Sequence, residues 1–391
     1  MTDKMNGSLS RRDAMRMGAA TAAALAAWSF SGGSARAASA VTLADIGVGD
    51  TGDWSKFTAA TGNDVNVLSM GNAPSAVVNQ LLAGGGLTNF NIVNIVGGMQ
   101  EPLVQNDLIR KLDTSRMPNW SANSYISDYL SPGTPGFDFI GYDGEVYGVP
   151  TVLQGDSFAY LPEETGELDS YAALFDPKFR GYVALEDNYT TAGQKTALFL
   201  NASGQANISD PADMTPEEVK TVIDFMIDQK RAGQFRVIWS SFEQAVNLLT
   251  SKEVYVMDCW EPMVFVARDQ GTNAVYAAPK EGYLLWAMAA YIVNNPQMSE
   301  EDLDATYQLL DFMLGGWYGA KITLMRGYMT NPLADDYASA NPGEFSAEEA
   351  ARVSEITGGV RAKFEKGGTW QNRWPTHVDV YEEEWQRFKS A

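Results

Sequence analysis

The sequence of 391 residues contains one cysteine, Cys259, and one histidine, His377. One cysteine excludes an internal disulfide, and one histidine excludes a multi-histidine metal site and most Ser/His or Cys/His catalytic pairs. We therefore expect no metal and no catalytic residues. Basic residues are also scarce, because 28 Lys and Arg stand against 49 Asp and Glu, a net charge of −21. This balance disfavours nucleic acid and anionic membrane surfaces and favours small or cationic partners.

Apolar runs of nearly membrane-spanning length are confined to the N-terminus. Arg11 and Arg12 precede an Ala-rich stretch at residues 17–30, which is followed by small-residue cleavage sites. The pattern predicts a signal peptide over residues 1–37, cleaved between Ala37 and Ala40, and the paired arginines favour the twin-arginine export machinery. A general secretory signal or a membrane anchor is the alternative. We expect a periplasmic protein whose net charge, without residues 1–37, falls from −21 to −24.

The remaining chain alternates strands and helices, which predicts an α/β protein. Strands are expected at residues 41–46, 65–68 and 92–96, with helices between them, so that two β-α-β units give parallel strands. A Gly- and Pro-rich stretch at residues 132–148 then leads into residues 149–152, where the first lobe could end. A second α/β unit is expected over residues 151–275.

Three helices of the later chain are predicted from their capping residues. Helix starts with a Ser or Thr cap and an acid three residues later are expected at Thr215 with Glu218, Ser299 with Asp302 and Ser346 with Glu349. Strands are expected at residues 254–258 and 288–293.

The turn at residues 47–52 fits the pattern G-x-G-x-x-G between a strand and a helix. This is the layout of a dinucleotide-binding turn, so an exported cofactor-binding oxidoreductase is one hypothesis. The acid expected about twenty residues later is missing. The competing interpretation is a turn whose backbone N–H groups face a ligand.

Ten tryptophans are more than core packing requires, and several follow strands or lie in turns. Aromatic faces with carboxylates nearby form ammonium sites, although a single tryptophan belongs to the core more often than to a ligand site. Trp260 is the best candidate, because Asp258 and Glu261 flank it. The others of interest are Trp239, Trp286, Trp370 and Trp374.

An acidic, exported α/β chain with tryptophans after its strands resembles the periplasmic polyamine-binding (spermidine/putrescine) family of ABC-transporter substrate-binding proteins. The stretches that carry the resemblance follow one another along nearly the whole mature chain. They are residues 57–62 (FTAATG), 107–113 (DLIRKLD), 147–150 (YGVP), 259–261 (CWE), 265–268 (FVAR), 279–282 (PKEG), 327–331 (GYMTN), 370–372 (WQN) and 381–383 (YEE).

The resemblance implies a two-lobed periplasmic-binding-protein fold with a hinge and a ligand cleft between the lobes. Lobe 1 would comprise residues 41–149 plus about 288–336, and lobe 2 residues 150–287 plus about 337–391. Hinges are expected near Pro150 and near residues 287–290. Such a protein is no enzyme, needs no cofactor, acts as a monomer and delivers its ligand to an ABC permease in the inner membrane.

The resemblance also implies four site residues. Trp260 and Trp286 match aromatic residues that pack on the ligand's methylenes. Asp187 matches a carboxylate that binds an ammonium group, and Gln371 matches a polar ligand contact.

Other positions depart from the family pattern. Met288 and Thr190 stand where the family has amine-binding acids, and glycine turns at residues 47–49 and 97–98 replace aromatic residues, which would expose backbone N–H donors. Candidate compensating acids are Glu261, Asp156 in a loop just past the lobe crossing, and Asp50 in the first turn. Arg373 would bring positive charge toward the ligand. The expected ligand is therefore a small amine, polyamine-like or zwitterionic.

Overall fold

The predicted alternation of strands and helices is present in the structure, a computed structural model that describes residues 39–391 except 71–73, 85–86 and 372. The predicted signal peptide lies outside the described residues. The strands are β1 (Ala40–Asp45), β2 (Asp64–Ser69), β3 (Ile92–Val96), β4 (Gly141–Tyr142), β5 (Glu145–Val146), β6 (Gly148–Tyr160), β7 (Val183–Glu186), β8 (Phe235–Trp239), β9 (Val256–Cys259), β10 (Val275–Tyr276), β11 (Tyr283–Ile292) and β12 (Gly368–Trp370). The helices are α1 (Ser55–Thr61), α2 (Pro74–Leu82), α3 (Glu101–Gln105), α4 (Ser124–Tyr129), α5 (Pro162–Thr165), α6 (Gln194–Ala202), α7 (Pro216–Arg231), α8 (Phe242–Thr250), α9 (Glu261–Asp269), α10 (Glu300–Met313), α11 (Gly316–Arg326), α12 (Leu333–Ala340), α13 (Ala347–Lys366) and α14 (Val378–Ser390).

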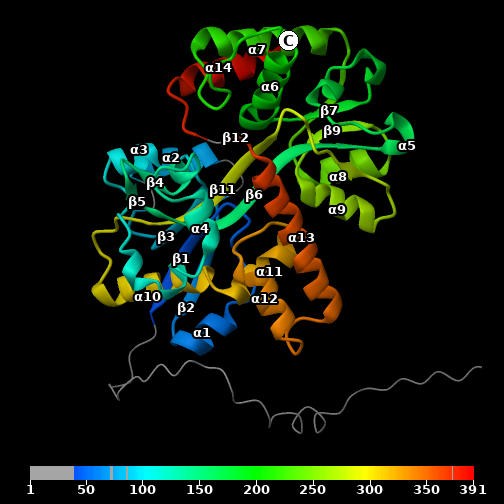
Figure 1. Cartoon of the computed structure of the whole chain (residues 1–391). Coiled ribbons are helices and arrows are strands. Elements are labelled where there is room, and N and C mark those ends of the chain that lie inside the picture. The colour runs from blue at the N-terminus through cyan, green and yellow to red at the C-terminus, as the bar shows by residue number, and fades with distance from the viewer. Residues whose placement is uncertain (1–38, 71–73, 85–86, 372) are drawn as a thin grey trace, which may run out of the picture. The chain divides into compact units, whose positions relative to one another are not determined.

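One sheet organises the fold, with the strand order β2-β1-β3-β11-β6-β9-β7-β8. β1 pairs in parallel with β2 and β3, as the two predicted β-α-β units require. β7 pairs in parallel with β8 and β9 in the same way. The long strands β6 and β11 are antiparallel and join the two parallel groups, as Figure 1 shows.

Every residue of β6 and β11 is buried. Their register shifts where Met288 faces Val152 and Ala289 faces Pro150, so Thr151 has no partner on β11 and forms a bulge. Pro150 has no N–H to contribute to the ladder, which favours an irregularity at this position. Bulges bend a strand locally. The bulge therefore lies at both predicted hinge positions.

The strand β6 contributes residues to two separate hydrophobic clusters. Leu153 belongs to the cluster that contains β1 and β3, whereas Phe158 belongs to a second cluster that contains β7 and α7. Phe364 of α13 packs in the first cluster, and Phe388 of α14 packs in the second. The four residues between Leu153 and Phe158 thus separate two cores, while the lobe boundaries themselves stay a prediction.

The predicted helix caps are confirmed. Reciprocal Ser/Thr and acid capping boxes begin α7, α10 and α13 at Thr215, Ser299 and Ser346. α1 ends at Gly62, whose φ of 78° is accessible to glycine at low cost. In the described part of the chain no helix is both long and apolar enough to cross a membrane.

Candidate functional site

Polar residues interrupt the middle of β6, where Gln154, Gly155, Asp156 and Ser157 are all buried. Gln154 and Asp156 share one face of the strand because side chains alternate. Asp156 was expected in a loop, and the structure corrects this, because the strand continues through Phe158 to its end. Buried polar side chains inside a central strand need partners.

Asp156 is 2% exposed and sits among polar atoms that lack partners. Its Oδ2 accepts a hydrogen bond from Nε2 of Gln371 at 3.1 Å. Within the described residues, Oδ1 of Asp156, Oε1 of Gln371 and Nε1 of Trp286 make no hydrogen bond. Burial raises the pKa of Asp156, although the charge of Lys195 and the adjacent Trp286 indole lower it. Two acceptor atoms without a regular hydrogen bond therefore belong to the adjacent side chains of Asp156 and Gln371, and the Trp286 indole lies near enough to Asp156 to lower its pKa as a hydrogen-bond donor does, as in a site that accepts a polar ligand.

Glu186 is the second buried carboxylate, at the end of β7. Its Oε2 accepts a hydrogen bond from Nε1 of Trp260 at 3.1 Å, and its backbone N–H donates to Oδ2 of Asp258 at 3.2 Å. Burial, and then the negative charge of Asp258, raise its pKa to about 8, against the lowering effect of Lys195. A cation that reached Glu186 would favour its ionised form.

Two other acids of this region are already paired with lysines. Asp258 forms a completely buried ion pair with Lys195. Glu261 forms an ion pair with Lys363, with 2.6 Å between Oε2 and Nζ. We call Asp156, Glu186, Lys195, Asp258, Glu261 and Lys363 the crossing cluster. Among the described residues, Asp156 and Glu186 are its acids without an ion-pair partner.

Aromatic rings border the crossing cluster. The ring of Trp286 meets Tyr328 edge-on at 5.4 Å, and that of Trp260 meets Trp239 edge-on at 5.6 Å. Trp239 is 1% exposed and donates its N–H to the backbone oxygen of Asp258 at 2.7 Å, so it belongs to the core. Tyr328 lies close enough to Asp156, Glu186 and Glu261 for their charges to raise its pKa further, after burial.

Asp187 has partners outside the crossing cluster. Its carboxylate accepts hydrogen bonds from Nε1 of Trp385 and from Nζ of Lys389, both at 2.8 Å and both on α14. The carboxylate that meets Trp260 is instead the preceding residue, Glu186. A ligand role for Asp187 stays a prediction.

Arg373 and Asp50 also have local partners. Arg373 pairs with Asp210 at 3.2 Å, and both side chains are 43% exposed. Asp50 accepts hydrogen bonds from the N–H of Gly52 and from Nε1 of Trp54, both at 2.9 Å. Neither of these contacts involves the crossing cluster.

The glycine turns do not present the free N–H donors that we expected. The N–H groups of Gly47 and Gly49 donate to the Asp45 carboxylate at 2.9 and 3.0 Å. In the second turn, the N–H of Gly97 donates to a backbone oxygen and that of Gly98 to a glutamine side chain. A carboxylate of the chain thus fills the place that a ligand's phosphate would take in a dinucleotide-binding turn.

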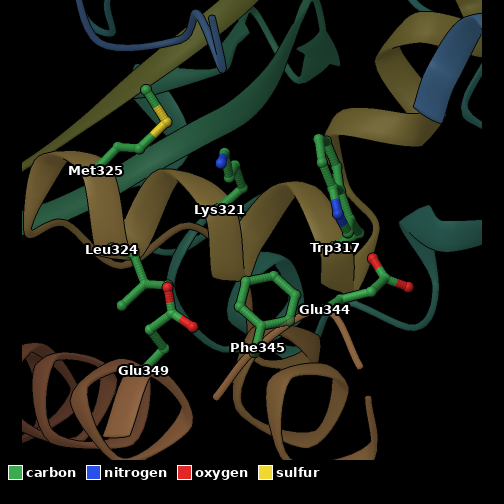
Figure 2. Close-up of a pocket in the computed structure, with 7 residues that line it drawn as sticks. All are labelled: Trp317, Lys321, Leu324, Met325, Glu344, Phe345 and Glu349. Atoms are coloured by element: carbon green, nitrogen blue, oxygen red, sulfur yellow. The ribbon is translucent and has the colours of Figure 1, made fainter. Parts of the chain in front are cut away.

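The cavity drawn in Figure 2 lies elsewhere, against α11 and the segment before α13. It has a volume of about 420 Å³, and its lining includes Trp317, Lys321 and Phe345 but no predicted site residue. A second hollow lies beside β8 and α8. In the described ranges no three His, Cys, Asp or Glu side chains are grouped to hold a metal ion.

Comparison with known proteins identifies the class. Residues 54–351 match the bacterial extracellular solute-binding protein family, and the chain belongs to this family. It is therefore a solute-binding protein and not an enzyme. The oxidoreductase hypothesis is therefore wrong, in agreement with the occupied Gly47 turn, and the resemblance stated from the sequence is confirmed.

Individual relatives and solved structures are similar to this chain. Spermidine/putrescine-binding periplasmic protein 1 of Haemophilus influenzae is 24% identical over 339 residues, which cover 86% of this chain and 84% of the relative. The spermidine/putrescine ABC transporter substrate-binding protein PotD from Streptococcus pneumoniae superposes with a TM-score of 0.68 at 15% identity, covering 90% of this chain and 99% of that one. The PBP MotA from A. tumefaciens B6, solved in complex with glucopine, gives 0.64 at 19% identity, covering 89% and 99%. The two-lobed fold is thus confirmed, and because it occurs with different ligands it does not identify this one.

Sequence reasoning missed Glu186, Lys195 and Lys363. Glu186 could have been found, because it closes an apolar strand one residue before the predicted Asp187. Lys363 could not, because it is one charged residue among many in a long helix. Its burial depends on the packing of α13 across β6.

Proposed function

We propose that this protein binds a small amine with two ammonium groups in the periplasm and delivers it to an ABC permease. The names of the curated relatives support an amine ligand, and their periplasmic location supports the compartment. The twin-arginine route and the monomeric state are part of the same proposal, and the route rests on residues 1–37.

The observation that carries the proposal is the charge balance of the crossing cluster. Lys195 and Lys363 neutralise Asp258 and Glu261, so two acids, Asp156 and Glu186, are buried without a cation. Burying uncompensated carboxylates is costly. A ligand with two ammonium groups would bring a cation to each acid and favour its ionised form.

The neighbouring groups suit such a ligand. The free Oδ1 of Asp156 and Oε1 of Gln371 could accept hydrogen bonds from one ammonium group. The indole rings of Trp286 and Trp260 lie beside the two carboxylates and offer faces to methylenes and cations. All four predicted residues, Asp156, Gln371, Trp286 and Trp260, therefore keep a place in the proposed site.

The zwitterionic alternative has less support. An anionic end was expected to meet Arg373 or the glycine turns, but Arg373 pairs with Asp210. The turn N–H groups of Gly47 and Gly49 are bound to Asp45. A cationic diamine fits the groups that remain.

Ligand capture would bend the chain at the Thr151 bulge. β6 and β11 join the two core clusters at this point, and a bulge interrupts their ladder. Ligand binding would then select the closed arrangement of the lobes, which the permease reads.

The test is titration calorimetry of the mature protein with putrescine. We expect binding by the wild type and a loss of about thirtyfold or more in Asp156→Asn, because a buried charge-assisted contact disappears. Asp210→Asn is the matched control, because it removes a half-exposed carboxylate and should leave the affinity unchanged. Equal affinities of the wild type and Asp156→Asn would overturn the role of Asp156.

A further inference from the structure

Lys363 places an ammonium group of the chain inside the crossing cluster. Its side chain is 5% exposed, and its Nζ donates to Oε2 of Glu261 at 2.6 Å and to Oε1 of Gln154 at 2.8 Å. The ring of Tyr276 lies 4.6 Å from the same Nζ, and that of Tyr283 lies 5.7 Å away. A carboxylate, an amide oxygen and aromatic rings are the groups that bind a primary ammonium ion.

Gly155 of β6 provides the space against which the Lys363 side chain packs. A Cβ added there would lie 3.2 Å from Cβ and 3.3 Å from Cδ of Lys363. The absence of a side chain on Gly155 therefore lets the methylene stem of Lys363 lie against the strand. Asp156, the next residue, is close enough for the charge of Lys363 to lower its pKa. The lysine thus adjoins the proposed ligand site.

We propose that Lys363 fills an ammonium site from within the chain and thereby makes the protein select ligands with two ammonium groups over ligands with three. The inference rests on the proposed function and adds to it the number of ammonium groups that the ligand carries. Two carboxylates, Asp156 and Glu186, are available to a ligand. A third ammonium group would need Glu261, where it would meet the positive charge of Lys363.

The test compares putrescine, a diamine, with spermidine, a triamine, by titration calorimetry. The wild type is expected to prefer putrescine by about tenfold or more, the effect of one like-charge contact. Lys363→Ala frees Glu261 and should shift the ratio of the two affinities toward spermidine by about tenfold. Lys363→Ala/Glu261→Gln removes the acid as well and should not show this shift, and Lys363→Arg should keep the wild-type preference.

A second measurement guards against loss of folding. Lys363→Ala leaves the partly buried Glu261 without a cation and should lower the melting temperature. Methylammonium chloride should raise the melting temperature of Lys363→Ala more than sodium chloride at equal ionic strength, because methylammonium fits the vacated site. The difference between the two salts should be smaller in the double variant and in the wild type, where methylammonium can reach only Asp156 and Glu186.

The outcomes separate the two ideas. Equal putrescine-to-spermidine ratios in the wild type and Lys363→Ala would overturn the inference and leave the proposed function intact. The same methylammonium effect in Lys363→Ala and in the double variant would also overturn the inference and leave the proposed function intact. Lys363 would then only link α13 to α9 through its ion pair with Glu261. Failure of the wild type to bind either amine would overturn the proposed function and the inference with it.

Discussion

Asp156 and Glu186 determine the chemistry of the site because they are buried carboxylates without a cation. Burial raises the pKa of both, so each holds its proton more firmly than an exposed acid. An incoming ammonium group reverses this, since an adjacent positive charge favours the carboxylate form. Ligand binding and proton release are therefore coupled.

The pKa of Glu186 predicts how ligand affinity depends on pH. At pH 6 the side chain is mostly protonated, because its pKa is about 8. We expect putrescine affinity to rise by about tenfold or more between pH 6 and pH 8.5, as Glu186 ionises. Asp258, Lys195 and Asp156 are the charged groups that face Glu186. The raised pKa of Asp156 also makes the affinity for putrescine increase with pH. Titration calorimetry across this range is the measurement.

Two variants check this prediction. Glu186→Gln should weaken binding and flatten the pH dependence, whereas Asp187→Asn should keep it, because Asp187 pairs with Lys389 on α14. A wild-type affinity that does not change with pH would contradict the assignment.

Stability without ligand should have the opposite trend. The pKa of Glu186 is about 8 in the folded protein and 4.5 ordinarily, so between these values the folded state holds a proton that the unfolded chain has lost. The stabilising contribution of this proton is complete below about pH 4.5 and is lost as the pH rises through about 8. The fall in melting temperature over this range should be smaller in Glu186→Gln.

At the scale of secondary-structure elements, the bulge in β6 is tied to β3 and β1 by buried side chains. Oγ1 of Thr151 donates to Oδ1 of Asn94 at 2.8 Å, and Nδ2 of Asn94 donates to Oδ1 of Asp45 at 2.7 Å. The same Asp45 carboxylate holds the first glycine turn. The bulge, and with it the proposed hinge, therefore has one defined geometry on the β1–β3 side.

Thr151→Val tests this connection. The substitution keeps the branched shape but leaves Oδ1 of Asn94 without a donor, so the free energy of unfolding should fall by about 1–3 kcal/mol. Thr151→Ser retains the hydroxyl and is the control. Urea denaturation measures both, and an unchanged stability of Thr151→Val would show that the hydrogen bond does not hold the bulge.

At the scale of the whole molecule, the negative charge should attract the ligand. The mature chain is expected to carry a net charge of −24, and such a field speeds the encounter with a cation. Raising the ionic strength from about 10 to 150 mM shortens the Debye length from about 30 to 8 Å. The association rate constant for putrescine should fall by about tenfold, with a smaller change in the dissociation rate constant. Stopped-flow tryptophan fluorescence measures both, and a salt-independent association rate would contradict electrostatic steering.

The sequence by itself determined the elements and the class of protein. The spacing of apolar residues, the turn residues and the helix caps are local signals. The β-α-β units and the three capping boxes could therefore be predicted. The ordered family stretches led to the solute-binding class. Three predicted residues that contact the crossing cluster, Trp260, Trp286 and Gln371, came from the same resemblance.

Only the tertiary structure decided which charges are free. Asp156 and Glu261 look alike in the sequence, but α13 brings Lys363 to Glu261 and leaves Asp156 without a cation. Asp187 and Glu186 are neighbours, yet one meets α14 and the other meets Trp260. Ion pairing depends on contacts between residues far apart in the sequence, such as Lys363 and Glu261, which are 102 positions apart. It also depends on the low dielectric of a buried site. No local pattern encodes either of these.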